Sequence, residues 1–257
     1  MPPQLALSPE PGRDKQIITL LADGNIYSTA RIAAEFGGET PALETLAALL
    51  GFYGVEIEVA GDDRLRLKHP IELLVADWIM TALQRSGSIP HRIDLAFSTD
   101  STNQALIERA GREDVHRHVY LAEFQRAGRG RRGKAWIAPL GSGLCMSIAW
   151  DLRVAPGVLA SLGLATATAA VRVLRNLGID DVGIKWPNDI WWENRKLGGI
   201  LVETRVGSNN KHTAVAGIGI NVAFPQRSLW EIEQPYTDVR TALGRAVSRN
   251  ALATALL

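Results

Sequence analysis

The segment "AEFQRAGRGRRGKAW", residues 122–136, decides between two fold classes. Its glycines Gly128, Gly130 and Gly133 have the G-x-G-x-x-G spacing of a dinucleotide-binding turn, which requires a strand before the turn and a helix directly after it. An apolar strand pattern precedes the glycines, but residues 134–150 ("KAWIAPLGSGLCMSIAW") contain Pro139, two glycines and then a β-like run. Because this pattern does not predict a helix there, the sequence argues against a doubly wound Rossmann sheet.

The loop in this segment also carries arginine at three positions between its glycines, namely Arg129, Arg131 and Arg132. Guanidinium groups bind phosphates and carboxylates bidentately, and glycine lets a backbone fold closely around such groups. We therefore expect a flexible loop, presented by a sheet, that closes over a polyanion. A solvated basic hairpin and a nucleic-acid patch are the alternatives, the latter because five basic residues lie between Arg126 and Lys134.

Bulk composition is that of an ordinary globular protein. The chain has 257 residues, of which 46% are hydrophobic and 21% charged, and its net charge of +1 selects neither nucleic acid nor a membrane as partner. The single cysteine, Cys145, excludes an internal disulfide, and its apolar surroundings indicate a buried structural thiol. The first 15 residues lack the pattern of a signal peptide, and we expect a cytoplasmic protein without a membrane span.

Two regions follow one another along the chain. Residues 1–70 contain three short helical patterns and then two alternating runs joined by Gly61-Asp62-Asp63, which together predict a winged helix-turn-helix module. Residues 71–257 alternate strand patterns with helices and hairpins. This order predicts an α+β domain with a mixed, largely antiparallel sheet.

A second polar cluster lies in "KWPNDIWWENRKLGGILVE", residues 185–203. Lys185 and Lys196 supply positive charge, and Asp189, in a turn set by Pro187, is a candidate ligand for a Mg²⁺ ion that bridges phosphates. The alternative is an ordinary Pro-Asn-Asp turn with solvated lysines. A third pattern, "GIGINV" at residues 217–222, predicts a strand whose glycines permit close approach of other groups.

Five motifs resemble those of biotin protein ligases in order and spacing: "DSTNQ", "EFQRAGRGRRGKAW", "KWPNDI", "RKLGGILVE" and "GIGINV". The N-terminal module resembles that of bifunctional ligase/repressors. The resemblance implies a catalytic domain with a class II synthetase-like sheet. It also implies that biotin and ATP form biotinyl-5′-AMP, from which biotin passes to a lysine of the biotin carboxyl carrier protein of acetyl-CoA carboxylase.

The resemblance implies roles for individual residues. It implies that Lys196, Arg131 and Arg129 are the catalytic residues. The expected biotin contacts are Ser101, Thr102, Asn103, Gln125, Arg129, Gly130, Arg131, Lys196, Gly199 and Gly217. The expected nucleotide contacts are Arg131, Arg132, Trp136, Lys185, Asn188 and Asn221, with Asp189 for Mg²⁺.

Two departures from that family leave alternatives open. Residues 32–63 contain seven acids and neither Lys nor Arg, so we expect the module to pack or bind a protein partner and not DNA. The family's small C-terminal SH3-like barrel has no counterpart, which implies a truncated chain or impaired ligase activity. The competing hypotheses are a biotin-responsive repressor or interaction module and a related lipoate ligase. The resemblance further implies that two copies can form a homodimer.

Overall fold

The computed structural model of the protein describes residues 11–37, 39–87, 90–153, 156–206, 212–225, 232 and 234–257. These divide into two compact units, one built mainly from residues before Leu74 and the other from most of those after it. No helix in the described ranges is long and apolar enough to cross a membrane.

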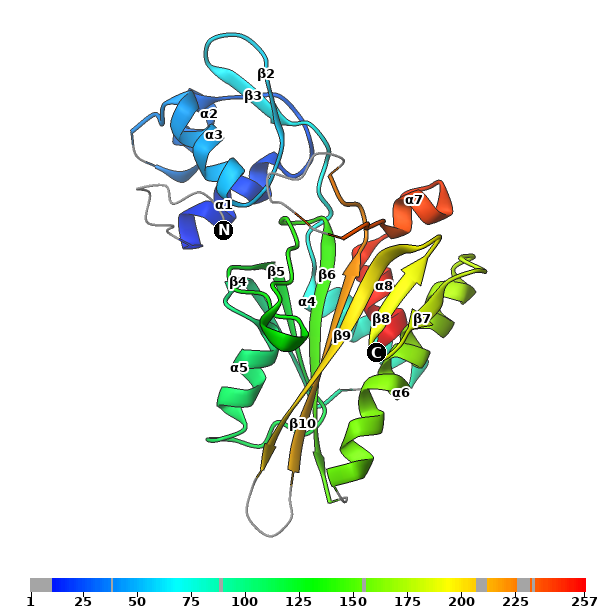
Figure 1. The fold of residues 1–257 in the computed structure, drawn as a ribbon. Coiled ribbons are helices and arrows are strands. Elements are labelled where there is room, and N and C mark those ends of the chain that lie inside the picture. The colour runs from blue at the N-terminus through cyan, green and yellow to red at the C-terminus, as the bar shows by residue number, and fades with distance from the viewer. Residues whose placement is uncertain are drawn as a thin grey trace. The chain divides into compact units, whose positions relative to one another are not determined.

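The described part of the first unit contains three helices and a small sheet, which can be followed in Figure 1. In chain order these are α1 (Pro11–Leu21), β1 (Tyr27–Ser28), α2 (Thr29–Phe36), α3 (Leu43–Phe52), β2 (Ile57–Val59) and β3 (Arg64–Leu67). The strands pair in the antiparallel order β1-β3-β2. The three helices and the β2–β3 hairpin match the pattern expected from the sequence, whereas β1 is an addition, since two residues give no period to detect.

The second unit is a seven-stranded sheet with helices on both faces. Its strands are β4 (Arg92–Thr99), β5 (His118–Gln125), β6 (Gly143–Leu152), β7 (Gly183–Lys185), β8 (Asp189–Trp192), β9 (Arg195–Val206) and β10 (His212–Asn221). They lie in the order β4-β5-β6-β10-β9-β8-β7. Only β4 and β5 pair in parallel, and every other neighbouring pair is antiparallel. The expected α+β class with a mixed, largely antiparallel sheet is therefore confirmed.

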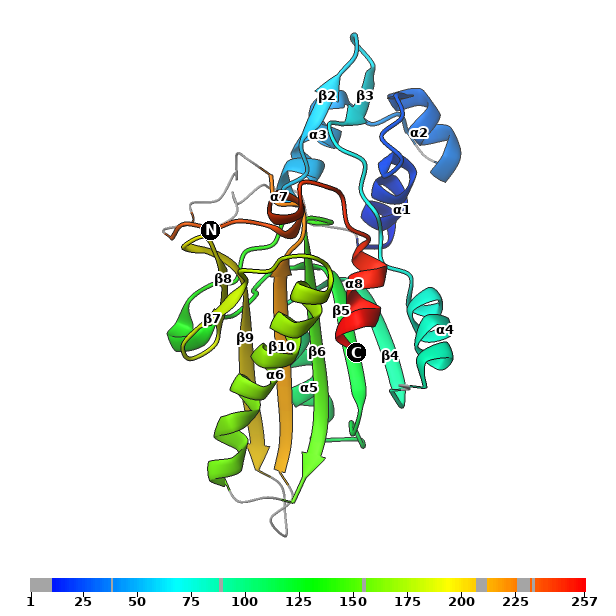
Figure 2. The same ribbon diagram turned by 90° about the vertical axis from the view of Figure 1, so that its right-hand side faces the viewer.

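The two faces of this sheet carry different layers. Helices α4 (Ala76–Ser86), α6 (Pro156–Asn176) and α8 (Arg249–Leu256) cover one face, and α5 (Thr102–Arg109) lies on the other (Figure 2). The short α7 (Val239–Leu243) precedes α8. The large hydrophobic core forms under the three helices, where Ile79, Leu174 and Leu252 are buried against the sheet. The α5 side has a much smaller core around Leu106, which leaves part of that face available for a site.

The central strand β10 shows how sequence alternation separates these two faces. Ile218 and Ile220 belong to the large core, while Gly217 and Gly219 alternate with them and face the α5 side. In β6 the partners of these glycines are Ser147 and Cys145, and in β9 they are Leu201 and Gly199. Two neighbouring rows of positions, which are small or polar except at Leu201, therefore cross three strands beside the start of α5.

Candidate active site

A cavity of about 390 Å³ opens over these rows of positions, which is within the size range of small-molecule sites. Its walls come from the start of α5, the glycine/arginine loop after β5, the turn between β7 and β8, and strands β6, β9 and β10. Tyr236 and Phe224 complete the lining. Segments far apart in the sequence therefore converge on one space.

Two glycines of β10 create room for side chains on this face. A Cβ added at Gly217 would lie 2.3 Å from Oδ1 of Asn103, and one added at Gly219 would lie 2.6 Å from the indole ring of Trp136. Real Cβ atoms do not approach other atoms so closely. The glycines of "GIGINV" thus seat Asn103 and Trp136 directly on the sheet, which is the close approach expected from the sequence.

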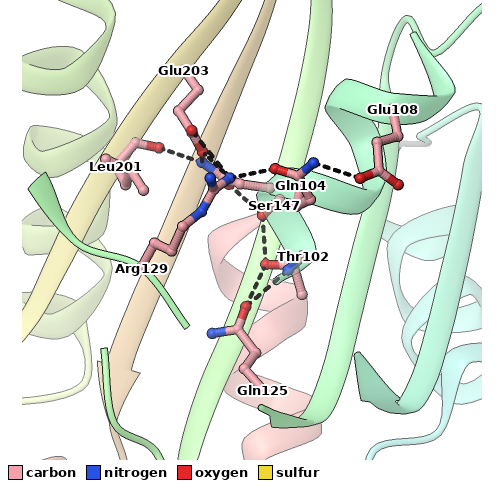
Figure 3. A network of polar contacts seen from close by, with 9 residues as sticks. Thr102, Gln104, Glu108, Gln125, Arg129, Ser147, Leu201 and Glu203 are labelled. Atoms are coloured by element: carbon pink, nitrogen blue, oxygen red, sulfur yellow. Dashed lines mark hydrogen bonds and ion pairs between the residues drawn. The ribbon is translucent and has the colours of Figure 1, made fainter. Parts of the chain in front are cut away.

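The floor of the cavity is a connected polar network (Figure 3). Gln125 Oε1 accepts a hydrogen bond from the backbone N–H of Thr102 at 2.8 Å and lies 3.2 Å from its hydroxyl oxygen. Ser147 Oγ lies 2.7 Å from Thr102 Oγ1 and 2.6 Å from Asn103 Oδ1. Thr102, Asn103 and Ser147 are buried, so this network is held in a fixed geometry inside the protein.

The glycine/arginine loop has a defined backbone over the cavity. Its two arms are joined by hydrogen bonds from Trp136 N to Gly128 O at 2.8 Å and from Gly130 N to Lys134 O at 2.7 Å, around the 3₁₀ turn η1 (Arg131–Gly133). An added Cβ at Gly128 would lie 2.3 Å from the carbonyl oxygen of Trp136, so this position requires glycine.

Two arginines of the loop reach across to other walls. Nη2 of Arg129 donates to Gln104 Oε1 at 2.8 Å and lies 3.2 Å from a carboxylate oxygen of Glu203. Nη1 of Arg131 donates to Oδ1 of Asn188 at 3.1 Å. Both guanidinium groups remain exposed, and both residues line the cavity. The loop therefore presents positive charge to any ligand held beneath it.

Lys196 adds a third cation from the far wall. Its Nζ forms an ion pair with Asp189 Oδ1 at 3.0 Å and lies 5.6 Å from the centre of the Trp136 ring. The side chain is mostly buried, at 16% exposure. Its backbone is fixed by hydrogen bonds with Pro235 and Thr237, so the ammonium group has a defined position in the cavity.

The chain was compared with known proteins. The model of the biotin/lipoate A/B protein ligase family matches residues 95–221. Over 241 residues the chain is 36% identical to the bifunctional ligase/repressor BirA of Salmonella typhimurium, covering 94% of this chain and 73% of that protein. This chain belongs to the biotin/lipoate A/B protein ligase family.

Two further similar proteins are also biotin ligases by name. The chain is 31% identical to the biotin–[acetyl-CoA-carboxylase] ligase of Mycobacterium tuberculosis, over 76% of this chain and 71% of that protein. The solved biotin protein ligase of Aquifex aeolicus in complex with biotin and ATP superposes with a TM-score of 0.51 at 26% identity. That superposition covers 65% of this chain and 67% of the Aquifex chain.

The residues expected from the ligase motifs mostly meet in the cavity. Its lining includes Ser101, Thr102, Asn103, Gln125, Arg129, Gly130, Arg131, Arg132, Trp136, Asn188, Asp189, Lys196, Gly199, Gly217 and Asn221. Lys185 is not among the lining residues, because its ammonium group stacks on the ring of Trp191 at 3.7 Å. Its predicted role with the nucleotide stays a prediction.

Several residues of the site were not expected from the sequence. Ser147 and Glu203 complete the polar network, and Trp186, which is 81% exposed, lies at the rim. Ser147 and Glu203 share a face with Gly217 and Gly199 through the register of β6, β10 and β9. Strand alternation within "RKLGGILVE" was therefore the signal that points to Glu203.

Cys145 lines the cavity without a reactive thiol. Burial raises the pKa of this cysteine to about 11, so the thiol stays protonated at neutral pH. The interpretation of a structural thiol fits these surroundings.

Acidic groups around the cavity are few. Asp189 is the one carboxylate among the lining residues, and the described residues contain no group of three or more His, Cys, Asp or Glu side chains that could hold a metal ion. This donor set fits a Mg²⁺ ion that takes most of its ligands from phosphates and water, and does not fit a cage made of protein groups alone.

Proposed function

We propose that this chain is an ATP-dependent biotin protein ligase, which activates biotin as an adenylate and transfers it to a lysine of a carrier protein. The observation that carries the proposal is the convergence of Arg129, Arg131 and Lys196 around one cavity whose floor is neutral and polar. Relatives that carry the names of biotin ligases support the same activity.

The first step joins two anions. A carboxylate oxygen of biotin attacks the α-phosphorus of ATP, the bond to the β-phosphate oxygen breaks, and pyrophosphate leaves. The reactants repel each other, and negative charge gathers at the α-phosphate in the transition state. Fixed cations there lower the barrier by positioning and electrostatic stabilisation, and we assign this role to Lys196, Arg131 and Arg129.

The second step moves biotin from the adenylate to the carrier. The lysine amine of a biotin carboxyl carrier protein attacks the carbonyl carbon of the anhydride, AMP leaves, and the amide nitrogen loses a proton. No nucleophilic side chain of the enzyme takes part, which agrees with the protonated Cys145 thiol. The glycine/arginine loop shields the anhydride from water until the carrier arrives.

The polar floor selects biotin over lipoate. The ureido ring of biotin carries two N–H donors and a carbonyl acceptor, whereas the dithiolane ring of lipoate has no comparable groups. A buried floor of hydroxyls and amides, from Ser101, Thr102, Asn103 and Gln125, is matched only by the first ring. We assign these residues, together with Gly130, Gly199 and Gly217, to the biotin subsite.

The nucleotide subsite lies on the Trp136 side of the cavity. Trp136, Arg132, Asn188 and Asn221 line the cavity. We assign Trp136 to stacking against adenine and the other three to contacts with the nucleotide. Asp189 would share in holding a Mg²⁺ ion, which when bound supplies charge neutralisation for the phosphates.

We infer that the N-terminal unit is a winged helix that packs or binds a protein partner. Residues 1–70 are assigned to this module and 71–257 to the catalytic domain. The three helices and the three-stranded sheet support the assignment. The absence of Lys and Arg from residues 32–63 argues against a DNA-binding surface there. A homodimer stays a prediction from the family resemblance.

Removing one cation from the cavity tests the proposed function. Lys196→Ala and Arg131→Ala are each expected to slow biotin-dependent pyrophosphate release by about a hundredfold or more, because each loses a charge aimed at the reacting phosphate. Lys68→Ala removes an exposed lysine that pairs with Glu56 and serves as the matched control. Near-normal release in both site variants would contradict the assignment.

A further inference from the structure

Glu203 is the one acidic group that touches both the floor of the cavity and the arginine loop among the described residues. One oxygen of its carboxylate accepts a hydrogen bond from Nδ2 of Asn103 at 2.9 Å. Nη2 of Arg129 lies 3.2 Å and 3.3 Å from the two carboxylate oxygens. Figure 3 shows Glu203 and Arg129 pointing toward one another. One side chain thus joins two walls of the site.

A carboxylate at this place fixes which way the Asn103 amide points. Its Nδ2 donates to Glu203 and to the carbonyl oxygen of Leu201 at 3.0 Å, and both of these partners can only accept. Oδ1 of Asn103 must then face Ser147, whose Oγ lies 2.6 Å away. Exchanging the amide nitrogen and oxygen would set acceptor against acceptor and is therefore excluded.

The orientation of the Asn103 amide also determines which neighbouring groups of the floor donate hydrogen bonds and which accept them. Ser147 Oγ has one hydrogen, which goes to Asn103, so at its 2.7 Å contact with Thr102 Oγ1 it must accept the Thr102 hydrogen. Gln125 Oε1 is then held by the backbone N–H of Thr102 at 2.8 Å. The order of donors and acceptors is set from the end where the Glu203 carboxylate and the Leu201 carbonyl both accept from Asn103.

The same carboxylate steers Arg129 without using all of its donors. A guanidinium group has five N–H donors. Among the described partners, Glu203 and Gln104 both use Nη2, and the side chain remains 42% exposed. The remaining edge of the guanidinium group is available to an anion in the cavity.

We propose that Glu203 is a positioning residue for biotin: it orders the donors and acceptors of the floor through Asn103 and aims Arg129 at the ligand's carboxylate. The inference rests on the proposed ligase function and adds a residue that sets specificity. Glu203 does not contact the reacting atoms and acts through its two partners.

Glu203→Gln is the sharpest test because it keeps the shape of the side chain and adds an N–H donor. The Leu201 carbonyl still holds Nδ2 of Asn103 in place, but the new amide has one oxygen in place of two, so its N–H donors face Asn103 or Arg129, and the charge that pairs with Arg129 is lost. We expect the KM for biotin to rise about tenfold, since a mismatched buried polar group weakens binding, while the KM for ATP changes by less than about twofold. Glu203→Ala is expected to raise the KM for biotin further.

Pyrophosphate release at varied biotin and ATP gives both constants, and thermal unfolding reports whether each variant is folded. Glu113→Gln, in an ion pair with Arg92 outside the cavity, is the control and should match the wild type. A folded Glu203→Gln variant with wild-type KM for biotin would overturn the positioning role alone. A wild-type chain that releases no pyrophosphate with biotin would overturn the ligase function and the positioning role with it.

Discussion

At the scale of single residues, Gly217 and Gly219 lie two positions apart on the same face of β10, and each makes room for a different part of the site. Gly217 leaves space for Asn103 and Gly219 leaves space for Trp136. The proposed function assigns Asn103 to biotin and Trp136 to the nucleotide. A methyl group at each glycine therefore tests the two subsites separately.

Gly217→Ala is expected to raise the KM for biotin by about tenfold or more, because the new Cβ displaces the Asn103 amide from its hydrogen bonds. Gly219→Ala is expected to raise mainly the KM for ATP, by about tenfold, because it displaces the Trp136 ring. Steady-state kinetics with each substrate varied in turn would show the split. Gly183→Ala, in strand β7 with nothing within 4 Å of the added Cβ, is the control. Equal effects of the two site variants on both constants would contradict separate subsites.

Most of the residues expected at the site could be taken from the sequence, because each of them belongs to one of the five motifs. Arg129, Arg131 and Lys196 were found from their motifs, and they line one cavity. Ser147 was missed because its importance comes from pairing between strands, and the register of β6 with β10 is a tertiary property. Glu203 was missed although alternation within its own motif puts it on the same face of β9 as Gly199. Lys185 belongs to a motif but stacks on Trp191 and does not line the cavity, so its role with the nucleotide stays a prediction.

At the scale of elements, the helices and hairpins could be read from periodicity and glycine punctuation. The long helix predicted after residue 156 ends at Asn176, and Gly178 follows with a φ of 106°. The parallel pairing of β4 with β5 was not predicted, because the sequence that connects two strands does not show whether they pair in the same or in opposite directions. The short strand β1 likewise exists only through its pairing with β3.

The α2–α3 region gives a prediction at this scale. Glu44 lies in the first turn of α3, and Arg31 at the start of α2 is already paired with Glu35 at 3.4 Å. Since phosphate neutralisation supplies most non-specific DNA affinity, we expect no shift of a duplex in a low-salt gel assay with biotin and ATP present. A Glu39→Lys, Glu44→Lys double variant should bind measurably more DNA and is the positive comparison. Tight, sequence-dependent binding by the wild type would contradict a partner-binding role.

At the scale of the whole molecule, the sheet of the second unit divides core from site. One face is covered by α4, α6 and α8 over a large apolar core, and the other carries α5 and the cavity. The alternation in β10 serves both faces at once, with isoleucines on the core side and glycines on the site side. Alternate residues of the same strand thus contribute to the hydrophobic core and to the proposed binding site.

The central claim is that this chain transfers biotin to a carrier through an adenylate. The direct measurement is to incubate the purified chain with ATP, Mg²⁺ and a biotin carboxyl carrier domain, with either biotin or lipoate, and to follow the mass of the carrier. We expect one added biotinyl group on a lysine, dependent on ATP, and no lipoyl group. An unmodified carrier in the presence of biotin, or modification by lipoate, would contradict it.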